Sequence, residues 1–251
     1  MNAVAQATLL VSFPVAAGAI GSTIAALRRP GPRLVSGIQH FAAGVVIAAL
    51  AGELLPDLRH EGNLGWAAAG FTAGVALVLA LAAYGRRLDQ VAESARTPFT
   101  DHRVAAAIPI GLLATVAIDL LIDGVLVGLG AQLGSSEALI LTIALTLEIL
   151  FLSLSLAAEL ADGGMTPRRA ALTCSALGLF TAVGAIASAA ILSGVGPAVL
   201  AFVLAFGAAA LLYLAVEELL VEAHEEAETA LLGAMFFAGF LTIYVLAELG
   251  G

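Results

Sequence analysis

The 251-residue chain has no lysine, a single cysteine and little charge of either sign. One cysteine, Cys174, excludes an internal disulfide and cannot by itself build a thiolate metal site. All ten basic residues are arginines against 19 acidic ones, which gives a net charge of −9. No basic patch for phosphate contacts stands out, so nucleic acid is not an expected partner. No nucleophile with a neighbouring base and no phosphate-binding loop is recognisable, so we do not expect an enzyme.

Apolar residues dominate what remains. They make up 61% of the chain, only 12% of residues are charged, and the mean hydropathy is +1.05. A soluble domain carries roughly 25% charged residues. The sequence therefore predicts an integral membrane protein whose surroundings are lipid.

Apolar runs of about 20 residues, each long enough for a membrane-spanning helix, recur along the whole chain. We predict an all-α polytopic fold with eight spans and a single transmembrane domain over residues 1–251. The spans are approximately Val4 to Leu27, Leu34 to Leu55, Leu64 to Tyr84, Val104 to Leu133, Ala138 to Leu160, Arg169 to Leu192, Pro197 to Val221 and Ala230 to Leu249. The first is interpreted as a retained helix and not a signal peptide. Residues 86–103 form the one longer connection, interpreted as a solvated loop with a helical piece.

Arginine placement predicts the orientation of these spans. Nine of the ten arginines fall in connections from odd to even spans, and only Arg59 falls on the opposite side. By the positive-inside rule, those connections are cytoplasmic and both termini lie outside. We expect the protein in a prokaryotic inner membrane.

Three carboxylates occur in the middle of apolar spans, where an unpaired charge costs roughly 2.5–3.5 kcal/mol even on insertion scales. Asp119 and Asp123 are one helical turn apart and share a face, and Glu148 lies halfway along the next, antiparallel span. A divalent cation with oxygen ligands would satisfy all three groups. The alternative is that they are protonated and hydrogen-bonded between helices, as polar contacts that hold the bundle together.

Further ionisable residues lie nearer the ends of the spans. Glu53, near the outer end of the second span, is a candidate for collecting cations at an entrance, or else an acid at the membrane interface. His40 lies toward the cytoplasmic part of the same span and is interpreted as a hydrogen-bonded histidine or a proton or metal relay. At the cytoplasmic end of the seventh span, Glu218, Glu222 and His224 form a candidate metal cluster, the alternative being a solvated helix end.

The order of these segments resembles the ZIP (Zrt/Irt-like) family of divalent metal transporters. The second span ends in ELLPD, similar to the family's His-Leu-Leu-Pro-Glu sequence, and the seventh span contains EEL followed by EAH. The resemblance covers essentially the whole chain. It implies a ZIP-like helix bundle, metal transport without a resident cofactor, release of metal near the seventh span, and homodimers as one assembly to expect.

The family's metal motifs are reduced in this chain. In the fourth helix, Asp119 replaces the usual His, Leu120 replaces Asn, and the acid and glycine at Asp123 and Gly124 remain; in the fifth helix only Glu148 remains. A two-metal centre is therefore not expected, whereas an all-oxygen site of three carboxylates is. Such ligands favour harder ions, so Mn²⁺, Mg²⁺ or Ca²⁺ stand beside Zn²⁺ and Fe²⁺ as candidate substrates. The alternative is a ZIP-like scaffold that moves protons or another solute, or serves as a membrane partner without transport.

Overall fold

Every secondary-structure element in the described part of the chain is a helix. The computed structural model describes residues 2–28, 30–60, 63–94, 110–133, 135–224 and 229–250. The elements are α1 (Ala3–Leu27), α2 (Pro32–Ala49), η1 (Leu50–Leu54), α3 (Leu55–His60), α4 (Leu64–Ser94), α5 (Ile110–Leu133), α6 (Ser135–Asp162), α7 (Pro167–Ile191), α8 (Pro197–Tyr213), η2 (Leu214–Leu219), α9 (Leu220–Ala223) and α10 (Ala230–Gly250). Within these residues, eight helices are long and apolar enough to cross a membrane. The predicted all-α fold with eight spans is thus confirmed for the part of the chain that the structure describes.

The connection between the third and fourth spans, predicted as a loop with a helical piece, begins with a helix. Helix α4 continues to Ser94, so the first half of the predicted loop at 86–103 is helical. The remainder of that loop, and the predicted start of the fourth span at Val104, lie outside the described residues. Helix α5 is described from Ile110 onward.

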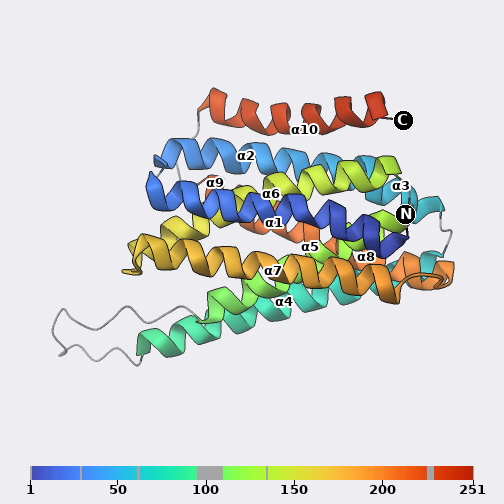
Figure 1. The fold of residues 1–251 in the computed structure, drawn as a ribbon, viewed down its shortest axis with the longest axis horizontal. Coiled ribbons are helices and arrows are strands. Elements are labelled where there is room, and N and C mark those ends of the chain that lie inside the picture. Colours follow the sequence, from blue (N-terminus) through green and yellow to red (C-terminus); the bar gives the residue numbers. More distant parts are fainter. Residues whose placement is uncertain are drawn as a thin grey trace.

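The helices run side by side in a bundle, with both chain ends at the same end of it (Figure 1). Helix α10 lies at one edge against α2. Its outward residues are apolar, with Phe237 71% and Leu249 80% exposed. An apolar outer surface is the expected state of helices whose solvent is lipid hydrocarbon.

Proline marks where three of the spans begin. Pro32, Pro167 and Pro197 each occupy the first turn of a helix, after a residue with extended backbone. The first turn tolerates proline because its backbone N–H groups have no partner within the helix. At the start of α1, the Asn2 side chain accepts a hydrogen bond of 2.8 Å from the Ala5 N–H, which caps the helix.

Glycine allows pairs of helices to pack backbone against backbone. A Cβ on Gly124 of α5 would lie 2.1 Å from the carbonyl oxygen of Thr181 on α7, and one on Gly184 would lie 2.2 Å from that of Leu121. The same kind of contact joins α2 to α10 at Gly44. Small residues drive helix association in membranes in this way. The contact at Gly124 fixes the part of α5 that carries the neighbouring Asp123.

Two spans contain a π-helical stretch, and both stretches carry glutamate. The segment η1 continues α2 and includes Glu53, and η2 continues α8 and includes Glu217 and Glu218. A π turn holds an extra residue and is often found at functional sites. These two segments change the direction of their glutamates relative to an uninterrupted α-helix.

Candidate functional site

The three carboxylates predicted from the middle of the spans are brought together by α5 and α6. One carboxylate oxygen from each of Asp119, Asp123 and Glu148 lies within 4.8 Å of the others. Asp119 and Asp123 reach the cluster from successive turns of α5, and Glu148 comes from α6. The spacing of one turn therefore places both aspartates on the face that meets Glu148.

Two of the three carboxylates are buried, and three of the cluster's oxygen atoms lack protein donors among the described residues. Asp123 and Glu148 are each 1% exposed, whereas Asp119 is half-buried. Among the described residues, Asp123 Oδ2 and both carboxylate oxygens of Glu148 have no hydrogen-bond partner. Buried polar atoms are nearly always hydrogen-bonded. These three oxygens lie together without a protein donor, and they are therefore available to bind a cation or a proton.

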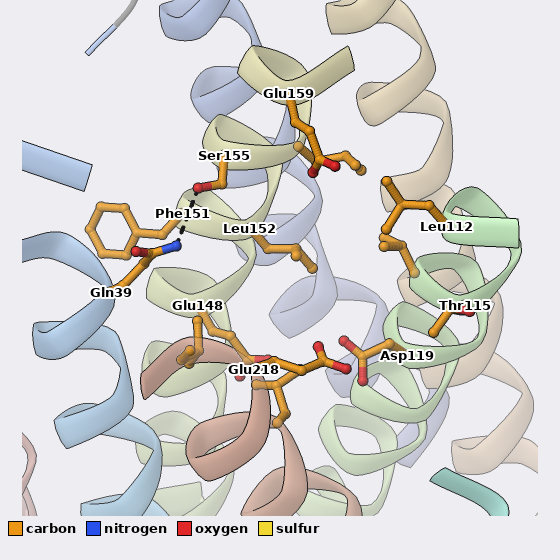
Figure 2. Close-up of a pocket in the computed structure, with 14 residues that line it drawn as sticks. Gln39, Leu112, Thr115, Asp119, Glu148, Phe151, Leu152, Ser155, Glu159 and Glu218 are labelled. Atoms are coloured by element: carbon orange, nitrogen blue, oxygen red, sulfur yellow. Dashed lines mark hydrogen bonds between the residues drawn. The ribbon is translucent and has the colours of Figure 1, made fainter. Parts of the chain in front are cut away.

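A cavity of about 280 Å³ adjoins the cluster (Figure 2). Asp119, Glu148 and Glu218 gather at one end of it, and Glu159 lies farther along α6. Glu159 is near the last turn of α6 and Leu112 is in the first turn of α5, and both line the cavity. The cavity therefore extends from the carboxylates toward the arginine-bearing end of the bundle.

Glu218 is a fourth acid of this site. It lines the same cavity and is close enough to Asp119, Asp123 and Glu148 for charge repulsion with each of them. The sequence placed Glu218 with Glu222 and His224 at the end of the seventh span. In the structure, Glu218 instead points inward from η2. The periodicity of apolar residues does not reveal a π-helical stretch, so the sequence could not predict this direction.

The other candidate ligands lie outside this cluster. Glu53 is half-buried on η1 and does not line the cavity. The backbone of Glu222 belongs to α9, and the placement of its side chain lies outside what the structure describes. His224 follows α9, and its ring lies 5.0 Å from that of His40 of α2, measured between centroids. Both histidines were candidate functional residues in the sequence, but no sequence pattern predicted that they lie together.

The arrangement is suited to binding a divalent cation. Carboxylate oxygens from two helices can enter one coordination shell, and the cavity beside them leaves room for water molecules as further ligands. Leu147 is half-buried and Phe151 lines the cavity, and neither side chain can bind a metal.

Comparison with known proteins identifies the family of the chain. A family model described as ZIP Zinc transporter matches residues 88–247, more than half of the chain. The match includes Asp119, Asp123, Glu148 and Glu218 and leaves out Glu53. No curated protein matches the chain. The chain therefore belongs to the ZIP zinc transporter family, whose members move divalent metal across membranes.

Proposed function

We propose that this protein carries a divalent metal cation across the membrane and that Asp119, Asp123 and Glu148 hold the ion partway. The observation that carries the proposal is the convergence of three carboxylates within 4.8 Å, with three buried oxygens that find no protein donor among the described residues. Uncompensated, like charges at this separation repel strongly. A bound divalent ion offsets two of the three charges, and a proton can offset the third.

The donor atoms favour harder ions. The cluster contains neither imidazole nor thiolate, and oxygen ligands suit Mn²⁺, Mg²⁺ and Ca²⁺ better than they suit high-affinity Zn²⁺. Mn²⁺ is therefore the first ion to test, with Zn²⁺ as the comparison because the family is named for zinc. Fe²⁺, Mg²⁺ and Ca²⁺ complete the series.

The path through the protein follows from the cavity. It leads from the carboxylates toward the end of the bundle that carries Arg168 and Arg169, which the positive-inside rule assigns to the cytoplasm. Glu218 lies at the carboxylate end of this cavity, where it adds negative charge on the inward route. Glu53 lies toward the end where the termini are found, on the proposed outer side, and would collect cations there.

Uptake into proteoliposomes tests the proposal. Purified protein should take up Mn²⁺, and Asp123→Asn or Glu148→Gln should abolish uptake because each replaces a charged carboxylate ligand of the cluster by a neutral amide. Glu218→Gln should raise the Mn²⁺ concentration for half-maximal uptake on the order of 10-fold, which corresponds to about 1.4 kcal/mol. Glu248→Gln is the matched control, because Glu248 is an exposed carboxylate on α10.

Two results would contradict the proposal in different ways. Wild-type uptake rates in both Asp123→Asn and Glu148→Gln would show that the ion uses another site. If the wild type takes up none of the five ions, the scaffold moves protons or another solute, or acts without transport.

A further inference from the structure

A small cavity, of about 20 Å³, lies between α4, α5 and α8 and shares two acids with the carboxylate cavity. Asp119 and Glu218 line both cavities, and their carboxylates point toward each other in Figure 2. Two more polar residues line the small cavity, Thr115 of α5 and Tyr213 at the end of α8, and its other lining residues are apolar. Asp119 and Glu218 are therefore reached by polar groups that do not line the larger cavity alone.

Helix α4 meets α5 beside this small cavity. A Cβ on Gly85 would lie 3.4 Å from Thr115 Oγ1, which places the two helices in contact there. The side chain of the next residue, Arg86, is hydrogen-bonded to that of Tyr213. A guanidinium group only donates hydrogen bonds, so the Tyr213 oxygen is the acceptor. The hydroxyl proton of Tyr213 is then left to donate to a further partner.

The remaining polar groups of the small cavity are acceptors. Thr115 Oγ1 donates its own proton to the Gly111 carbonyl oxygen at 3.1 Å, so toward any other partner it accepts. Ionised carboxylates, such as those of Asp119 and Glu218, only accept. A cavity can hold a water molecule when it offers roughly 10–15 Å³ and two to four polar partners. The small cavity meets both conditions, with one donor and three acceptors for a molecule that accepts and donates.

We propose that one ordered water occupies this cavity and joins Tyr213 to the carboxylates of Glu218 and Asp119, which makes Tyr213 a positioning residue of the metal site. The water accepts the Tyr213 hydroxyl proton and donates its own two protons to the acids. Arg86 strengthens this chain from its far end, because hydrogen bonds in series polarise one another. A positive charge outside the site thus orients two acids without taking a coordination position. The positioning role rests on the proposed transport function, whereas the hydration site does not.

An experimental map of the metal-free full chain, at a resolution that shows ordered waters, tests the hydration site. We expect one water within about 3.0 Å of the Tyr213 hydroxyl and of a carboxylate oxygen of Glu218 or Asp119. A cavity without water density, or a water that does not contact Tyr213, would overturn the proposal.

Calorimetric titration of the full chain in detergent with Mn²⁺ tests the positioning role. Tyr213→Phe should weaken Mn²⁺ binding by about 10-fold, since loss of a partner that orients a ligand costs roughly 10–100-fold in metal affinity. Arg86→Gln should weaken binding in the same direction. Tyr244→Phe on α10 and Arg87→Gln on α4 are the matched controls, because they make the same chemical changes at exposed residues, and both should bind Mn²⁺ as the wild type does.

A Glu218→Ala background distinguishes positioning from a general loss of packing. There, Tyr213→Phe should cost less than about 3-fold in Mn²⁺ affinity, because the two changes remove the same chain of contacts and are not additive. An equal loss with and without Glu218, or no loss in either background, would overturn the positioning role. If the wild type binds neither Mn²⁺ nor Zn²⁺, the transport function and the positioning role fail together, and the map still decides the hydration site.

Discussion

Replacing Glu148 by glutamine should make the metal-free protein more stable and at the same time remove its response to metal. Glu148 shares the cluster with Asp119 and Asp123, with ligand oxygens no more than 4.8 Å apart. At this distance and an effective dielectric constant of 20, two ionised carboxylates repel by about 3.5 kcal/mol. Ionised pairs that lie closer than 4.8 Å repel more strongly, and protons bound to the cluster reduce the repulsion. Glutamine removes the Glu148 charge and adds an N–H₂ group that can donate to its neighbours.

The effect of metal has the opposite sign. A ligand that binds only the folded protein stabilises it by about 2.7 kcal/mol at 100 times its dissociation constant. Wild-type protein should gain that amount in Mn²⁺, whereas Glu148→Gln has a neutral amide in place of a carboxylate ligand and should gain less than half of it. For a chain of this size, each kcal/mol changes the unfolding midpoint by about 2–4 °C. We therefore expect the variant to unfold at least about 2 °C higher without metal and to show less than half of the wild-type rise with it.

Cys174 provides the assay. It is the only cysteine of the chain and is 1% exposed, so a thiol-reactive fluorophore labels it only when the helices around it separate. The midpoint of labelling on heating therefore reports unfolding. Glu248→Gln should match the wild type with and without Mn²⁺. A Glu148→Gln protein that is less stable without metal, yet keeps the full Mn²⁺ response, would refute the reasoning about both charge and ligation.

Two further predictions concern packing and orientation. Gly124→Ala should lower the labelling midpoint of Cys174, because the new Cβ would lie 2.1 Å from the Thr181 carbonyl oxygen and overpacking costs about 1–3 kcal/mol. Gly178→Ala is the control and should be neutral or stabilising, since a Cβ there would meet no neighbouring atom within 4 Å. Equal effects of the two changes would argue against close packing at α5. In intact cells, an impermeant thiol reagent should label Ser193→Cys, between the sixth and seventh spans, and not Gly163→Cys, between the fifth and sixth. The reverse pattern would invert the proposed orientation.

The fold could be predicted from the sequence because the length and polarity of each span are visible in its residues. Runs of about 20 apolar residues have one stable solution in lipid, a helix that satisfies all its backbone groups internally. The proximity of Asp119 to Glu148 could also be predicted from the sequence. A turn of helix places Asp119 and Asp123 on one face, and a short connection forces α6 to run back along α5.

The sequence could not predict the position of Glu218 or the proximity of His40 to His224. Both depend on contacts between helices far apart in the sequence, which local patterns do not encode. The seventh span also departs from α-helical periodicity within η2, so a helical wheel drawn through it gives Glu218 the wrong direction. The length of the helical piece at the start of the loop at 86–103 could not be predicted either, because polar residues can continue a helix beyond its apolar span, as α4 does to Ser94.

The π-helical segment η2 gives this family member a way to change its cavity by insertion or deletion of a single residue. A π turn accommodates one residue more than an α turn, so loss of one residue from Leu214–Leu219 can be absorbed by reversion to an ordinary α-helix. The flanking α8 and α9 would keep their phase, and His224 would keep its neighbours. Residues within the segment, Glu218 among them, would turn by about 100°, the angle between successive helical residues. In an alignment of related chains, a one-residue gap at η2 would therefore mark proteins whose cavity lacks the fourth acid even though their sequence retains it.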